Sequence, residues 1–145
     1  MGYTSYDVTY PDWIYDESSI DRLDGRQIYW AGVDPSRDNA DGKGVIESGT
    51  IMAVLASGQI VPRADVAAGL GDVINTETSI GILIATVVED ANHAALTGHG
   101  LAVGGVVFEN LLPDSGAGAF ATWQGELQTA GTRFMWLNHA NSAAS

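Results

Sequence analysis

The chain has 145 residues, no cysteine, and a formal net charge of −12 from eighteen acidic and six basic residues. This length suits one domain that buries its own core, and the missing cysteines exclude disulfides and thiol nucleophiles. The negative charge repels nucleic-acid phosphates and anionic lipids, so we expect neither as a partner. The N-terminus has no basic stretch followed by an apolar one, and the longest apolar run, 80–88, is far shorter than the roughly 20 residues that span a bilayer. We therefore expect a soluble chain without a signal peptide.

Residues 1–45 differ in character from the rest of the chain. They contain nine of the acidic residues, four of the six basic residues and all five tyrosines, but few aliphatic clusters. Turn-forming residues dominate 34–44, which is typical of a loop. We interpret 1–45 as an acidic, aromatic N-terminal arm that is extended or wraps around a partner.

Residues 46–138 alternate apolar, β-favouring runs with Gly, Pro and Asn, which predicts a β-rich domain. The expected strands are 50–55, 59–63, 80–88 and 101–109. Ser57-Gly58 is expected to form the turn between the first two. The near-continuous apolar run at 80–88 favours a strand that is covered on both faces.

The C-terminal part predicts one short helix followed by one strand. Apolar residues at three- and four-residue spacing favour a helix over 117–131, which Gly131 is expected to end. The strand 132–138 should place Phe134 and Trp136 on one face, and the tail 139–145 should fray. The expected fold class is therefore α+β, β-rich, with one short C-terminal helix.

Candidate chemistry is sparse. The loop 34–44 has oxygen-bearing side chains, but its spacing does not fit an EF-hand, so a solvated turn is favoured over an irregular calcium site. The three histidines, at positions 93, 99 and 139, have no metal-ligand spacing. No serine or acidic pair has a positioned partner for catalysis. We expect no enzyme activity, no cofactor and no metal site.

The aromatic residues of the arm are more informative. Tyr10, Trp13, Ile14 and Tyr15 lie in a polar segment with no local core for them. Aromatic residues are favoured anchors at buried interfaces, which predicts a docking role. The alternative is that the segment folds back on its own domain, and the sequence leaves both open.

Four stretches, taken in order, resemble the lambda-like head decoration proteins of tailed phages. A Gly-Thr start with two apolar strands occupies 47–65, a strand that ends in an acidic pair occupies 77–90, and a strand that begins after Gly occupies 100–112. A helix, a Gly-Thr break and an apolar strand follow at 126–137. The resemblance covers about two-thirds of the chain and does not extend to residues 1–45.

The resemblance implies a structural virion protein. Members of this family form homotrimers that bind the exterior of the expanded capsid at or near its threefold points and cement it. It also implies a compact β-tulip fold, no catalytic site, and an N-terminal segment that faces the major capsid protein and adds a strand to its sheet. On this basis Tyr10, Trp13, Ile14 and Tyr15 are our predicted capsid-binding residues.

Two other functions remain open from the residues alone. A virion-surface, adhesin-like module that binds a glycan would also use exposed aromatic and acidic side chains. A small hydrolase that uses an acidic pair is the third possibility, and the lack of a positioned partner residue counts against it.

Overall fold

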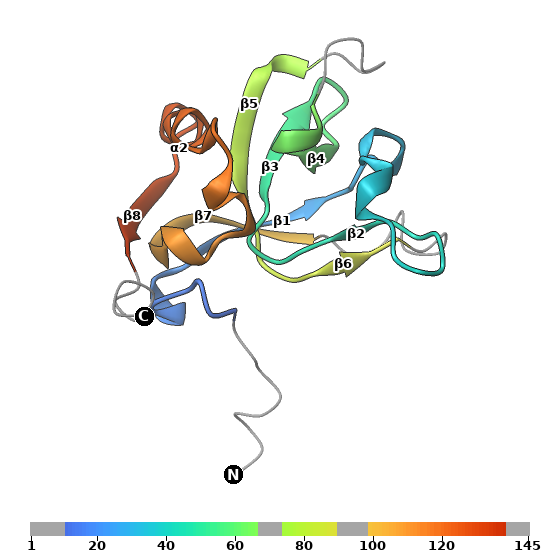
Figure 1. Cartoon of the computed structure of the whole chain (residues 1–145). Helices are drawn as coiled ribbons and strands as arrows, with labels where there is room; N and C mark the ends of the chain where they lie inside the picture. The colour runs from blue at the N-terminus through green and yellow to red at the C-terminus, as the bar shows by residue number, and fades with distance from the viewer. Residues whose placement is uncertain (1–10, 67–73, 90–98, 139–145) are drawn as a thin grey trace.

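A computed structural model describes residues 11–66, 74–89 and 99–138 of the chain (Figure 1). These residues form a β-rich α+β fold, as predicted. The strands are β1 (Asp21–Arg26), β2 (Val45–Ile46), β3 (Ile51–Leu55), β4 (Ile60–Pro62), β5 (Ile74–Leu83), β6 (Val87–Val88), β7 (His99–Phe108) and β8 (Arg133–Leu137). The α-helix of the described residues is α2 (Phe120–Thr129). Short 3₁₀ turns connect several of these elements, among them η1 (Glu17–Ser19), η3 (Pro35–Arg37), η4 (Arg63–Asp65) and η6 (Pro113–Gly116).

The main sheet curls so that the chain just after one outer strand, β1, reaches the other outer strand, β4. Its order is β1-β7-β5-β3-β4, and all of these neighbours are antiparallel. Just after β1, the chain pairs with β4: Tyr29 N–H donates to Ile60 O (2.9 Å), and Ile60 N–H donates to Gln27 O (2.8 Å). These two bonds close the sheet into a small barrel. β2 and β6 form a separate two-stranded sheet.

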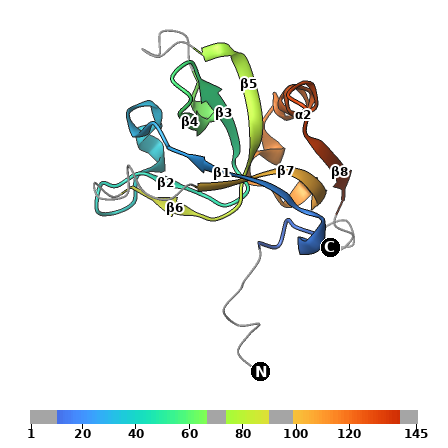
Figure 2. The same ribbon diagram turned by 180° about the vertical axis from the view of Figure 1, so that it is seen from behind.

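The two halves of β7 have different neighbours. The first half lies between β5 and β1, as Figure 2 shows from behind. The second half pairs in parallel with β8. On the other side of this second half, Tyr15 N–H donates to Val106 O (3.0 Å) and Phe108 N–H donates to Trp13 O (2.7 Å). The segment 13–15 therefore lies beside the chain's own sheet.

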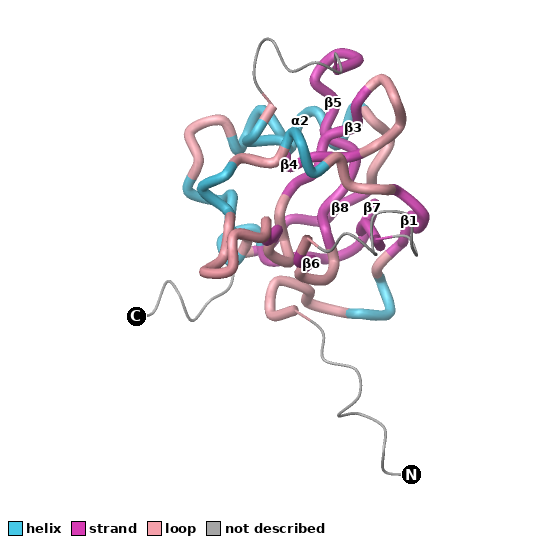
Figure 3. Tube along the Cα trace, turned by 90° about the vertical axis from the view of Figure 1, so that its right-hand side faces the viewer, coloured by secondary structure: helices cyan, strands magenta, loops and turns pink. Residues whose placement is uncertain are grey.

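Two apolar clusters form the core. One lies inside the barrel and takes one buried residue each from β3, β4, β5 and β7, together with Ile28, which follows β1, and Ile46 of β2; its members are Ile28, Ile46, Met52, Ile60, Leu83 and Leu101. The other lies between the sheet and α2, which Figure 3 shows packed against the central strands. It contains Trp13, Ile51, Ile82, Phe120, Trp123 and Leu127, among others. The alternation of side chains along each strand separates the two clusters.

The predicted hairpin, the strand 101–109 and the final strand are confirmed within a residue or two. The turn residue Gly58 has φ +93°, which suits glycine, and Phe134 and Trp136 both pack on the second cluster, as predicted. The single strand predicted over 80–88 is wrong. β5 ends at Leu83, the chain passes through exposed Ala85 and Thr86, and β6 belongs to the other sheet.

The structure also shows two strands that were not predicted, β1 and β2. β1 lies inside 1–45, and residues 11–45 pack along the barrel through β1, Ile28 and Trp13. Residues 1–10 lie outside the described part of the chain, and so does the tail 139–145.

The helix ends where the sequence predicts. Gly131 has φ +98°, and its N–H donates to Gln128 O (3.1 Å), while Thr132 N–H donates to Leu127 O (3.1 Å). This pair of bonds is a Schellman motif, which requires a left-handed residue after the helix and so favours glycine. The motif turns the chain directly from α2 into β8.

Gly125 offers a simple test of the helix. It lies on the exposed face of α2, and a Cβ at this position would meet no atom within 4 Å. Gly125→Ala should raise the free energy of unfolding by about 0.5–1 kcal/mol, because alanine loses less backbone entropy in a helix. Urea unfolding followed by circular dichroism measures this. A lower midpoint for the variant would contradict the helix assignment.

Candidate functional site

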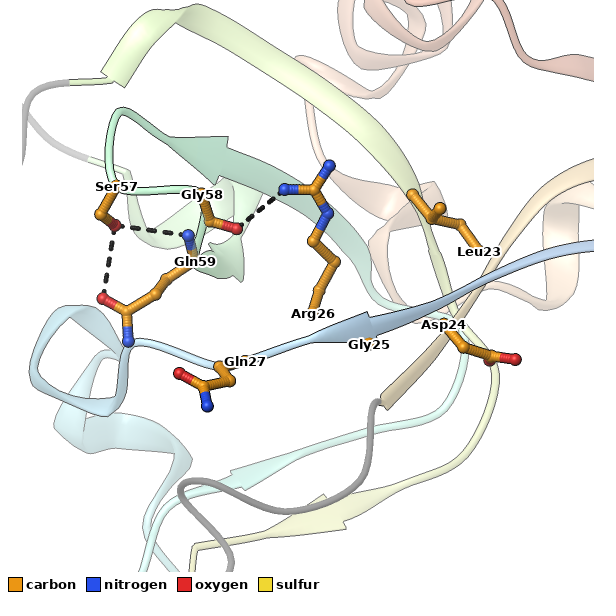
Figure 4. Close-up of a pocket in the computed structure, with 8 residues that line it drawn as sticks. All are labelled: Leu23, Asp24, Gly25, Arg26, Gln27, Ser57, Gly58 and Gln59. Carbon is orange, nitrogen blue, oxygen red and sulfur yellow. Dashed lines mark hydrogen bonds between the residues drawn. The ribbon is translucent and has the colours of Figure 1, made fainter.

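The described part of the barrel has an opening between β1 and the turn of the β3–β4 hairpin. A cavity of about 420 Å³ lies there (Figure 4). Its walls are the end of β1 and the hairpin turn: Leu23, Asp24, Gly25, Arg26, Gln27, Ser57, Gly58 and Gln59. We call this opening the barrel mouth. Most of its lining is polar, and mouths of β-barrels are frequent ligand sites.

Arg26 extends across the barrel mouth. Its Nη1 donates to Gly58 O (3.1 Å), and Figure 4 shows the side chain pointing from β1 toward the hairpin turn. The pairing of β1 with β7 shifts register between Leu23 and Arg26, where Gly25 has φ +96°. A β-bulge of this kind re-aims the side chains that follow it. The Asp24-Gly25 bulge thus directs a half-buried cation into the mouth.

A second recess, of about 330 Å³, adjoins the first and shares Leu23 and Arg26 with it. Its lining is more apolar and includes Ile80 of β5 and Val103 of β7, beside the end of α2. Leu23 is 36% exposed although it is a large aliphatic residue. The two recesses together are lined by one guanidinium, the Asp24 carboxylate, several amide and hydroxyl groups, and an aliphatic patch.

The residues predicted to bind a capsid occupy different environments. Trp13 is 2% exposed and belongs to the second core cluster, and its indole N–H donates to Ser48 Oγ (3.0 Å). Ile14 is half-buried and forms a backbone bridge with Val107. Tyr15 is 61% exposed, with its ring edge-on to Phe108. Tyr10 lies outside the described residues.

Of the two alternatives left open by the sequence, folding back is what the structure shows for Trp13 and Ile14. The indole of Trp13 is enclosed by the protein's own core, so it has no free surface to offer a partner. Of the three predicted residues that the structure describes, Tyr15 presents the largest exposed fraction.

An ion pair holds α2 against the barrel. Arg63 donates to both carboxylate oxygens of Glu126, at 2.9 and 3.0 Å, and Ser79 Oγ–H donates to Glu126 Oε1 (2.7 Å). The Arg63 guanidinium also lies 5.9 Å from the ring centre of Trp123. Partial burial alone would raise the pKa of Glu126, but the hydrogen bonds from Arg63 and Ser79 outweigh it and hold that pKa below its ordinary value.

Glu126→Gln should lower the free energy of unfolding by about 1.5–3 kcal/mol at neutral pH, since hydrogen bonds to a charged group are lost. Because the pKa of Glu126 is lower in the folded state, its ionisation stabilises the fold above its unfolded pKa of about 4.5. This contribution is lost as the pH falls through the folded pKa. Urea unfolding of both proteins near pH 7 and near pH 3 checks this: the difference should shrink at the lower pH. An equal difference at both values would contradict the assignment.

Other acidic groups bond to the backbone of the chain itself. Asp114 is buried, and its Oδ2 accepts from Ile51 N–H (2.9 Å); burial raises the pKa of Asp114 despite this bond. In the 34–44 loop, Asp34 Oδ1 accepts from Ser36 N–H, which lowers the pKa of Asp34, and Asn39 Oδ1 accepts from the amides of Asp41 and Lys43. Two of the oxygens considered above for calcium, Asp34 Oδ1 and Asn39 Oδ1, thus bond to the backbone of local turns.

Among the described ranges, no three His, Asp or Glu side chains converge as a metal ion would require. His93 and His139 lie outside these ranges, and the side chain of His99 is not described. None of the helices in the described part has the length and apolarity needed to cross a bilayer.

No pattern in the sequence predicts the barrel mouth. The mouth exists because residues 27–29 pair with β4. This contact joins distant parts of the chain, so no local sequence pattern predicts it. The one local signal was Asp24-Gly25, a dipeptide typical of turns and bulges.

No protein-family model matches the chain, and a comparison with curated proteins finds no match.

Proposed function

We propose that this chain is a structural virion protein: a homotrimeric decoration protein that binds the exterior of an expanded phage capsid, at or near its threefold points, and stabilises it. The major capsid protein is its proposed partner. The fold would be β-tulip-like, and the N-terminal arm would face the shell. Binding would act by mass action, because a ligand that binds only the expanded shell stabilises that state.

One observation supports this proposal more than any other. The four stretches that carry the resemblance to head decoration proteins contain the strand pair, the strand after glycine and the helix–strand unit expected of them, whereas the strand expected to lead into the acidic pair Glu89-Asp90 ends at Leu83. The first gives the β3–β4 hairpin, the second and third give β5 and β7, and the last gives α2, the Gly131 turn and β8. This order of elements supports the proposal.

The surface offers apolar side chains for association. Tyr15, Leu23, Val88 and Met135 are the exposed large hydrophobic residues of the described part of the chain. Tyr15 belongs to the N-terminal arm, residues 1–45. A trimer would present three such segments to the shell at once, and linked binding sites can gain roughly 10²–10⁴ in avidity.

Co-sedimentation tests the proposal. The purified chain should pellet with expanded, DNA-free heads of the phage that encodes it, and should do so saturably. Tyr15→Ala should weaken this binding about fivefold or more, because an aromatic anchor at an interface contributes more than about 1 kcal/mol.

Val88→Ala is the matched control, since Val88 is also exposed but lies on the separate β2–β6 sheet. It should pellet like the unmodified chain. If the unmodified chain stays in the supernatant with expanded heads, the proposed function is wrong. If Tyr15→Ala binds normally, the arm does not use Tyr15.

A further inference from the structure

One edge of β1 is unpaired within the described part of the chain. β7 pairs with the other edge, and β1 stands at the end of the strand order. The free edge comprises Asp21–Arg26, and its second half lines the barrel mouth. It ends where Gln27 and Tyr29 pair with Ile60. A free edge presents unpaired N–H and C=O groups that accept a further strand.

Arg26 adds a charge requirement at this edge. The described ion pairs join Arg22 with Asp24, Arg37 with Asp65 and Arg63 with Glu126. Arg26 has no carboxylate partner among the side chains that the structure describes, which do not include those of 74–78, although the chain carries three times as many acidic as basic residues. Its hydrogen bond to the neutral carbonyl of Gly58 leaves other guanidinium N–H groups available. A carboxylate is the group that a guanidinium binds best.

The N-terminal sequence contains a segment of matching character. Residues 4–9 read TSYDVT, in which polar Ser5, Asp7 and Thr9 alternate with Tyr6 and Val8. Such alternation predicts a strand with one polar and one apolar face. The polar face holds a single carboxylate, that of Asp7, with a hydroxyl on either side. It complements a mouth that holds the Arg26 guanidinium beside Ser57 and Gln59 and whose one carboxylate, that of Asp24, is paired with Arg22.

We propose that residues 4–9 of a second copy of this chain add to the free edge of β1 as a further strand, with the Asp7 carboxylate bound to the Arg26 guanidinium. Ser5 and Thr9 then face the polar lining of the mouth. Tyr6 and Val8 point the other way, away from the mouth.

The chain's own N-terminus is too short and points the wrong way for this contact. The described segment begins at Pro11, beside Phe108 at the far end of β7, and runs antiparallel to β7. Arg26 pairs with His99 at the opposite end of β7, about 30 Å along the strand. From Pro11 back to Asp7 the chain spans at most about 14 Å and would first have to reverse direction. A second copy removes both obstacles.

This inference rests on the self-association in the proposed function and names a contact that would hold it. Each copy gives a segment and receives one, so the contact is heterologous and closes into a ring when the rotation between copies allows it. Three copies would give three such contacts.

Charge reversal in the full-length chain tests the pairing. Sedimentation equilibrium of Asp7→Arg and of Arg26→Asp should each show the trimer dissociating at concentrations about tenfold higher or more, because each places like charges together. The double variant Asp7→Arg/Arg26→Asp restores opposite charges and should recover most of the loss. The matched controls are Asp12→Arg and Arg133→Asp, which make the same charge changes at exposed positions and should leave the trimer unchanged.

A second measurement covers the case in which Arg26→Asp folds poorly. Since the chain has no cysteine, Asp7→Cys chains can be mixed with Arg26→Cys chains and treated with a short bismaleimide. A covalent pair of chains is expected, whereas Asp12→Cys mixed with Arg26→Cys should give none.

This inference is wrong if the single variants form trimers as stable as those of the unmodified chain and no covalent pair appears. That result would not contradict the trimer itself. An unmodified chain that never forms trimers would overturn both. Trimers that show the Asp7–Arg26 coupling but do not pellet with heads would overturn the capsid function alone.

Discussion

Replacing Trp13 with alanine is expected to lower the free energy of unfolding by about 3–5 kcal/mol, the range seen for large aromatic residues removed from a core. The indole is 2% exposed and packs in the cluster between the sheet and α2. Its N–H bonds to Ser48 Oγ, and a Cβ added to Gly49 would come within 3.0 Å of Trp13 Nε1. The cavity left by alanine cannot collapse easily around so many fixed neighbours.

Urea unfolding measures this loss, and Tyr15→Ala is the control. Tyr15 lies two residues away and is largely exposed, so its truncation should cost within about 1 kcal/mol. If the Trp13 variant were as stable as the Tyr15 variant, the segment 11–15 would not belong to the core. That result would favour the alternative, in which Trp13 is exposed and binds the shell.

Gly105→Ala should be the second most damaging change, with an expected loss of about 2–4 kcal/mol. The residue has φ +131°, where a side chain costs about 1–2 kcal/mol. An added Cβ would also lie 2.6 Å from Ile20 Cδ1 and 3.0 Å from Ser19 O. Ile20 can move its methyl group, but the carbonyl belongs to the backbone that leads into β1, so β1 must shift.

The same substitution at Gly125 provides the control. The substitution adds one methyl group in both cases, but Gly125→Ala is expected to raise the free energy of unfolding and Gly105→Ala to lower it. The reason is that Gly125 has open space around it and lies on the exposed face of α2. Equilibrium unfolding of the two variants side by side checks both. A Gly105→Ala protein at least as stable as the unmodified chain would show that β1 does not approach β7 as described.

Several elements were predictable because their causes are local. Ser57-Gly58 supplies the residue that a tight turn needs, and Gly131 supplies the left-handed residue that ends α2. The spacing of Phe120, Trp123 and Leu127 gives one buried helix face, and that face is buried in the structure. In each case a few adjacent residues decide the conformation.

β1 was not predictable, because its sequence lacks the usual signals of a strand. Its residues, DRLDGR, are mostly charged, and most of them are exposed in the structure. They form a strand because they pair with the edge of β7. In addition, Trp13, which precedes β1, and Ile28, which follows it, both pack into the core. Tertiary packing thus overrides a weak local preference for the β conformation.

The barrel mouth depends on the same long-range contacts. Nothing in the local sequence distinguishes Arg26 from an ordinary surface cation, and only the closure of the barrel through Ile28 and Ile60 places it across an opening. For a related reason, the sequence does not distinguish the buried Trp13 from the exposed Tyr15 among the predicted docking residues. Local sequence does not say that Trp13 reaches a core built from residues far along the chain, while Tyr15 stays outside.

The mass of the purified chain in solution tests the proposed function most directly, because the proposed mechanism requires self-association. Sedimentation equilibrium of the full-length protein should give a species of roughly 46 kDa, a homotrimer of the 15.2 kDa chain, that persists on dilution into the low micromolar range. A mass of 15.2 kDa at every concentration measured would contradict the account.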